Sequence, residues 1–118
     1  MFLIVPLIQD VQLENITTAI NKGDLTTLSN YLDDTVEVTL LEDGDIYLKT
    51  EAVNKLENFF AKHPSLSFQA VHKGFSESRG SLYCIGDLKT KQEQFRVFLY
   101  IKVENEQYFI QELRFEKN

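Results

Sequence analysis

The chain has 118 residues, which is enough for one domain with its own hydrophobic core but not for two. Its 18 acidic and 12 basic residues give a formal net charge of −6, and the basic residues are scattered. Because binding to a nucleic-acid backbone needs a concentrated basic surface, the sequence predicts no nucleic-acid partner. The single cysteine, Cys84, excludes a disulfide framework and a cysteine-based zinc site.

Residues 1–8 form an apolar segment that is far too short to cross a bilayer, so no integral membrane segment is predicted. The segment suits the end of a signal-peptide hydrophobic region, but it lacks a basic start and a small-residue cleavage site. Two interpretations stay open: residues 1–9 are a signal-peptide remnant, or they are an apolar tail that packs on the domain or on a partner. The domain itself is expected over residues 10–118.

The next elements are two helices. Leu13, Ile16 and Ile20 form one apolar stripe, which predicts a first helix with Asp10 as its N-cap and Gly23 as its left-handed end. A second short helix is predicted from the apolar stripe of Leu25, Leu28 and Leu32. Asp33 and Asp34 are expected to end it.

A period of two in the apolar residues predicts the strands. The first covers residues 36–40, and an Asp-Gly turn at 42–45 leads to a short returning strand at 46–48. A third helix follows, capped by Thr50, with Val53, Leu56 and Phe60 on one stripe and Pro64 after its end. Further strands are predicted at 67–76 and 81–89.

The clearest pattern is a hairpin over residues 94–116 with its turn at 104–106, which we expect at the centre of the sheet. Its apolar row is Phe95, Val97, Leu99, Ile101 and Val103. Helices followed by a run of strands with short turns predict an α+β domain in which the helices cover one face of an antiparallel sheet.

This order of elements resembles the NTF2-like, or cystatin-like, cone, in which three N-terminal helices pack in the concave face of a curved antiparallel sheet. A finer resemblance rests on short segments, namely Ala19-Ile20, Gly23-Asp24, Phe59-Phe60, His72-Lys73-Gly74, Tyr83, Ile85-Gly86, Arg96-Val97 and Gln111-Glu112-Leu113-Arg114-Phe115. They are similar to a family of short bacterial proteins of unknown function, largely from the Bacteroidota. Because members often carry an export signal, the resemblance implies a periplasmic or secreted location, with a cytoplasmic one left open.

The wider superfamily includes isomerases, dehydratases and protein-binding modules, and its enzymes place acid and base residues inside the cone. His72 is therefore the candidate general base, with Tyr83 or Glu112 assisting. If the face that His72 shares with Phe68 and Ala70 turns inward, His72 is a partly buried base. If the opposite face turns inward, His72 lies on the outer surface.

Four residues are candidates for a ligand pocket: Tyr31, Tyr47, His72 and Tyr83. Each tyrosine hydroxyl either lies at a pocket rim or packs at the edge of the core. Cys84 is interpreted as a small buried hydrophobic residue rather than a reactive thiol.

Arg96 and Glu112 are predicted to form a cross-strand salt bridge on the outer face of the hairpin. Arg96, Phe98 and Tyr100 lie opposite the apolar row and would expose an aromatic patch, which predicts a homodimer through the sheet.

No metal site and no cofactor are predicted, because the histidines lie on different elements and no phosphate-binding loop is present. Two hypotheses remain. The first is a non-enzymatic homodimer that binds a small apolar ligand or a protein partner, and the second is an isomerase-like or dehydratase-like enzyme with His72 as general base.

Overall fold

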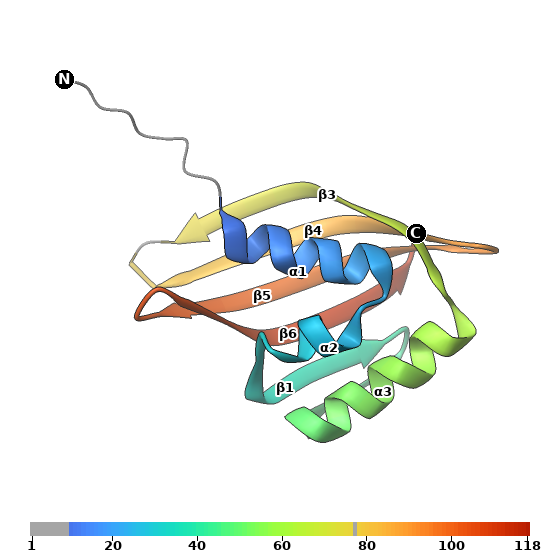
Figure 1. Ribbon diagram of the computed structural model, residues 1–118, viewed down its shortest axis with the longest axis horizontal. Helices are drawn as coiled ribbons and strands as arrows, with labels where there is room; N and C mark the ends of the chain where they lie inside the picture. Colours follow the sequence, from blue (N-terminus) through green and yellow to red (C-terminus); the bar gives the residue numbers. More distant parts are fainter. Residues whose placement is uncertain (1–9, 77) are drawn as a thin grey trace.

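The computed structural model describes residues 10–76 and 78–118, so the predictions for residues 1–9 lie outside the described residues. The elements follow the chain as α1 (Val11–Lys22), α2 (Leu25–Ser29), β1 (Leu32–Leu40), β2 (Asp43–Leu48), α3 (Lys49–Lys62), β3 (Ser65–Ser76), β4 (Ser81–Thr90), β5 (Gln94–Glu104) and β6 (Gln107–Lys117). The strands form one sheet in the order β2-β1-β6-β5-β4-β3. Helix α1 lies along β3, and α3 lies against β1 and β2 (Figure 1). The predicted α+β class is confirmed.

The predicted hairpin is confirmed as the middle of the sheet, formed by β5 and β6. Phe95, Val97, Leu99 and Ile101 are at most 1% exposed and face the helices. The ring centroid of Phe59, from α3, lies 5.2 Å from that of Phe95 and 4.8 Å from that of Phe115. Aromatic side chains therefore fill the concave side of the sheet beneath α3.

The ends of α1 follow the sequence. Asp10 accepts a hydrogen bond of 3.1 Å from the backbone N–H of Leu13, and Gly23 adopts the left-handed conformation with φ 67°. The predicted start of α3 is wrong by two residues, since its first residue is Lys49 and its N-cap is Leu48, not Thr50. There the backbone N–H of Leu48 donates to Glu51 Oε1 at 3.1 Å.

The prediction that the second helix continues through Leu32 is wrong. Helix α2 ends at Ser29, and Leu32 begins β1, where it pairs with Ile110 of β6 and is 1% exposed. Asp33 therefore lies in a strand and does not end a helix. The pairing of β1 with β6 is parallel, so this one pair departs from the all-antiparallel arrangement expected.

The turn between β1 and β2 also differs from the prediction. It is formed by Leu41 and Glu42, with Leu41 at φ 64°, while Gly44 lies within β2 opposite Thr39. A Cβ atom on Gly44 would lie 2.6 Å from Oγ1 of Thr39. The glycine therefore permits close strand pairing, and this explains why an Asp-Gly pair occurs here without forming the turn.

A β-bulge in β3 changes which of its side chains face the helices. Ala70 pairs with Gly86 and His72 pairs with Ile85, so Val71 is an extra residue on β3. The alternation of side chains is reversed after Val71. His72 consequently faces away from the helices, and Lys73 faces toward them.

A second bulge has the same effect in β6. Ile110 pairs with Ile101 and Glu112 pairs with Tyr100, which leaves Gln111 as the extra residue. Ile110 is fully buried beneath the helices, whereas Glu112 lies on the outer face with its partner Tyr100. A strict period of two would place Ile110 and Glu112 on one face, and the bulge places them on opposite faces. Among the described residues, no helix combines the length and apolar character that crossing a membrane requires.

Candidate functional site

The three candidate catalytic residues lie on the outer face of the sheet. His72 is exposed and pairs with Ile85, Tyr83 is 46% exposed, and Glu112 pairs with Tyr100. Of the two orientations considered for His72, the structure has the outward one. The reason is the extra residue in β3, which breaks the alternation on which the inward orientation depended.

The candidate pocket tyrosines lie in separate places. The Tyr31 hydroxyl accepts a hydrogen bond of 2.9 Å from Asn15 Nδ2, and the Tyr47 ring centroid lies 5.5 Å from Lys55 Nζ. Tyr83 is on the outer face, where its ring lies over Gly74. The structure therefore does not bring these residues together with His72 around one cavity.

The predicted salt bridge between Arg96 and Glu112 is wrong. Arg96 is aligned with Glu116 across the hairpin, and its Nε donates to Oδ1 of Asp87 on the neighbouring β4 at 2.9 Å. The bulge in β6 and the register of the hairpin separate Glu112 from Arg96.

The outer face carries an apolar cluster that we call the outer patch, formed by Tyr83, Ile85, Phe98 and Tyr100. These residues are cross-strand neighbours on β4 and β5, and Tyr100 is 39% exposed. A hollow of about 260 Å³ lies over the outer patch and reaches Glu112 and Arg114 on β6. All three candidate interface residues, Arg96, Phe98 and Tyr100, lie on this face.

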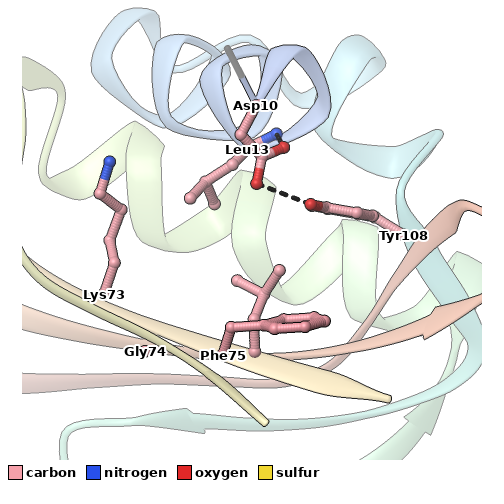
Figure 2. A pocket seen from close by; sticks show the side chains of 7 residues that line it. Asp10, Leu13, Lys73, Gly74, Phe75 and Tyr108 are labelled. Carbon is pink, nitrogen blue, oxygen red and sulfur yellow. Dashed lines mark hydrogen bonds between the residues drawn. The ribbon is translucent and has the colours of Figure 1, made fainter. Parts of the chain in front are cut away.

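A second hollow lies on the helix side, at the open end of the cone, and we call it the mouth pocket. Its volume is about 420 Å³, and its lining consists of Asp10, Leu13, Lys73, Gly74, Phe75, Leu82 and Tyr108. Figure 2 shows Asp10, the N-cap of α1, and Leu13, on α1, above Phe75 of β3. Lys73 and Tyr108 stand on opposite sides of it. Four elements, α1, β3, β4 and β6, therefore contribute to this pocket.

The polar end of the mouth pocket is formed by Asp10 and Tyr108. The Tyr108 hydroxyl donates a hydrogen bond of 2.6 Å to Oδ2 of Asp10, and Oδ1 of the same carboxylate caps α1. Burial of the phenol, together with this hydrogen bond and the charge of Asp10, raises the pKa of Tyr108 well above its ordinary value. Tyr108 therefore remains a neutral donor throughout the physiological range.

Sequence reasoning identified Asp10 only as a helix cap and did not select Lys73 or Tyr108. Lys73 follows the bulge in β3 and Tyr108 precedes the bulge in β6, so each bulge decides which residues of its strand share a face with them. The only available signal was the alternation itself, which the extra residues interrupt.

A larger hollow of about 620 Å³ lies beside the β1–β2 turn and is lined by Leu40, Leu41, Glu42, Asp43, Glu116 and Lys117. Three acidic side chains and one lysine surround it. Its walls are the turn and the end of β6, so it does not lie within the cone.

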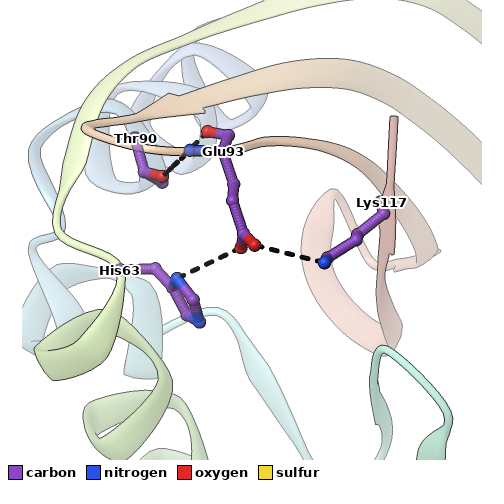
Figure 3. Close-up of polar contacts among 4 residues, drawn as sticks. All are labelled: His63, Thr90, Glu93 and Lys117. Atoms are coloured by element: carbon purple, nitrogen blue, oxygen red, sulfur yellow. Dashed lines mark hydrogen bonds and ion pairs between the residues drawn. The ribbon is translucent and has the colours of Figure 1, made fainter.

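Polar contacts join three chain segments at the opposite end of the cone (Figure 3). Glu93, in the β4–β5 turn, lies 3.7 Å from Nδ1 of His63 at the end of α3 and 3.1 Å from Nζ of Lys117 in β6. Thr90 holds the turn, because its hydroxyl donates to the Glu93 carbonyl at 2.8 Å. The His63 ring packs against Phe59 and Phe95, which gives this cluster a structural role.

Cys84 is fully buried, as predicted, and burial raises the pKa of its thiol, so the thiolate is disfavoured. Within residues 10–76 and 78–118, no group of three or more His, Cys, Asp or Glu side chains is placed to hold a metal ion.

The arrangement of helices over a curved sheet is that of the NTF2-like fold. An NTF2-like protein of unknown function from Shewanella baltica aligns with a TM-score of 0.67 at 11% identity, covering 92% of this chain and 89% of that one. The resemblance to the NTF2-like cone is therefore confirmed for the fold.

The particular family is also shown: the chain belongs to the family described as Domain of unknown function (DUF4783), whose model matches residues 13–116. A DUF4783 family protein from Bacteroides ovatus is 29% identical with a TM-score of 0.82, covering 88% of this chain and 93% of that chain. One from Bacteroides uniformis is 28% identical with a TM-score of 0.83, covering 89% and 95%. No curated protein matches the chain. The resemblance to short Bacteroidota proteins of unknown function is confirmed.

Proposed function

We propose that this protein is a non-enzymatic binding domain that acts as a homodimer through the outer face of its sheet. The observation that carries the proposal is the outer patch, where Tyr83 and Tyr100 are 46% and 39% exposed beside Ile85 and Phe98. Soluble monomers seldom expose a contiguous apolar patch of aromatic side chains, and such patches mark interaction sites. A second copy of the same face would cover this patch in a two-fold dimer.

The charges around the outer patch support pairing with a second copy. Arg96 is paired with Asp87 at 2.9 Å, and Arg114 Nε lies 3.5 Å from Oε2 of Glu116. Both signs of charge are therefore present on this face, although the chain as a whole carries a net charge of −6. Two copies that associate through this face therefore experience less like-charge repulsion than two copies that associate through a uniformly acidic surface.

The contents of the cone support a binding role over catalysis. Phe59, Phe95 and Phe115 pack in the concave side, and the buried polar residues in the described part of the chain are Ser81 and Thr90. The alternative hypothesis needs His72 inside the cone as a general base, but His72 is exposed on the outer face. The open mouth pocket supports the binding of a small ligand.

Sedimentation equilibrium tests the dimer. We expect the wild-type chain to approach twice its mass of 13.7 kDa with increasing concentration. The Tyr100→Glu variant places a carboxylate in the outer patch and should remain a monomer. A Thr18→Glu variant, exposed on α1, is the matched control and should dimerise like the wild type. Equal association of all three proteins, or a monomeric wild type, would refute the proposal.

The proposal includes a periplasmic or secreted location, which rests on the family resemblance. Fractionation of the cells that naturally make the protein tests this part separately. Recovery of the chain in the periplasmic or extracellular fraction is the expected result, and recovery only in the cytoplasm contradicts it.

A further inference from the structure

We infer that the mouth pocket binds an amphipathic monocarboxylate, a small molecule with an apolar body and a single carboxylate that Lys73 holds. This inference names the ligand class of the binding domain proposed above and rests on that function. It follows from the shape, the apolar lining and the distribution of charge in the mouth pocket.

The apolar body of the ligand is defined by the floor and roof of the pocket. Leu13 projects from α1, while Phe75 and Leu82 come from β3 and β4. Phe75 is 60% exposed, so a ligand in the mouth pocket would remove a large aromatic surface from water. The volume of about 420 Å³ falls within the range of roughly 300–1,000 Å³ that is usual for small-molecule sites.

The charged group of the mouth pocket that is available to a ligand is the ammonium of Lys73. Both carboxylate oxygens of Asp10 already accept hydrogen bonds, one from the Leu13 N–H and one from the Tyr108 hydroxyl. Lys73 forms no ion pair with any carboxylate among residues 10–76 and 78–118. A lysine ammonium beside an apolar surface suits a carboxylate whose hydrocarbon part covers that surface.

The positions of these groups also limit the ligand to one carboxylate. Figure 2 shows Lys73 on one side of the mouth pocket and Tyr108, bonded to Asp10, on the other, with Leu13 above and Phe75 below. A carboxylate at Lys73 therefore directs the apolar chain toward Asp10. A second carboxylate at the far end of the ligand would meet the negative charge of Asp10, which disfavours binding.

The test is an NMR titration of the full-length chain with octanoate, 1-octanol and octanedioate, which share one chain length and differ in their end groups. We expect saturable shifts of Leu13, Leu82 and Tyr108 resonances with octanoate at concentrations up to about 10 mM. Octanol lacks the charge and octanedioate adds the second one, so both should bind at least about fivefold more weakly.

Two variants separate the role of Lys73 from a general charge effect. Lys73→Met should weaken octanoate binding by about tenfold, because it removes a charge-assisted contact. Lys89→Met removes an exposed strand lysine outside the lining and should leave the affinity unchanged. Absence of saturable shifts, equal binding of octanol or octanedioate, or equal loss in both variants would overturn the inference.

Failure of this inference and failure of the proposed function give different results. If octanoate does not bind but the chain forms a Tyr100-dependent dimer, the ligand class is wrong and the dimeric binding domain stands. If the chain is a monomer that binds octanoate through Lys73, the ligand inference stands and the proposed dimer is wrong.

Discussion

Tyr108 donates a hydrogen bond of 2.6 Å to Asp10, and this contact joins the start of β6 to the N-cap of α1. Asp10 simultaneously caps α1 through its other oxygen. One carboxylate therefore fixes both the beginning of the helix and its position over the sheet, and it forms one wall of the mouth pocket.

Replacement of Tyr108 by phenylalanine should destabilise the domain by about 1 kcal/mol, because the change removes the hydrogen bond to Asp10 while keeping the ring. Urea unfolding at pH 7 measures this difference. Tyr47→Phe is the control, since the half-buried Tyr47 hydroxyl makes no hydrogen bond within the described residues, and its stability should match the wild type. Equal stability of Tyr108→Phe and the control would show that the contact is not stabilising.

Gly86→Ala should be more destabilising than Gly74→Ala. A Cβ on Gly86 would lie 2.4 Å from Cζ of buried Phe68 and 2.8 Å from the backbone oxygen of Gln69, neither of which is free to move. We expect a loss of about 1–3 kcal/mol.

At Gly74 a Cβ would lie 2.2 Å from Cε2 of Tyr83, whose exposed ring can rotate away. Thermal melting of both variants compares the two sites. A larger loss for Gly74→Ala would contradict the proposed packing.

Asp33 should make part of the stability depend on pH. Burial opposes its ionisation, but hydrogen bonds from the Gln111 side chain and the Asp34 N–H, with the charge of Lys102, hold its pKa below the ordinary value of 3.8. A lowered pKa in the folded state means that the ionised carboxylate contributes stability above pH 3.8. That contribution is lost as the pH falls through the folded pKa.

Asp33→Asn should therefore lower the free energy of unfolding by up to about 1 kcal/mol at pH 7. The loss is no larger because the ion pair with Lys102, at 3.5 Å, is near the surface. At pH 3 the loss should be smaller, because part of the wild-type carboxylate is then protonated. Urea unfolding at the two pH values measures both differences. Asp34→Asn, on the exposed neighbouring residue, is the control and should change stability little. A deficit that is the same at both pH values would contradict the role of ionised Asp33.

Much of the fold could be predicted because its signals are local. The cap at Asp10, the left-handed Gly23 and the apolar row from Phe95 to Ile101 all occur as expected. Leu32 was misassigned because its spacing from Leu28 fits a helix, whereas its pairing with Ile110 is formed between residues far apart in the sequence. Local patterns do not report such pairing.

The candidate site was less predictable because it depends on two single-residue bulges. Val71 and Gln111 are the extra residues of the two bulges, and neither is a glycine, the residue type that often marks a bulge. Each reverses the alternation, so His72 moves to the outer face and Lys73 to the mouth pocket. A strict period of two that ignores the bulges therefore predicts the wrong polar residues for the concave side of the sheet.

Dimerisation through the outer patch is tested by measuring which face becomes covered as the protein associates. Relaxation enhancement by a soluble gadolinium chelate reports the solvent accessibility of individual methyl and ring protons. With rising protein concentration, Ile85, Phe98 and Tyr100 should become protected. Leu66 and Ile46, which are 64% and 67% exposed and lie outside the outer patch, should remain accessible. Unchanged accessibility of the outer patch at high concentration, or protection of Leu66 or Ile46 in its place, would contradict dimerisation through the outer patch.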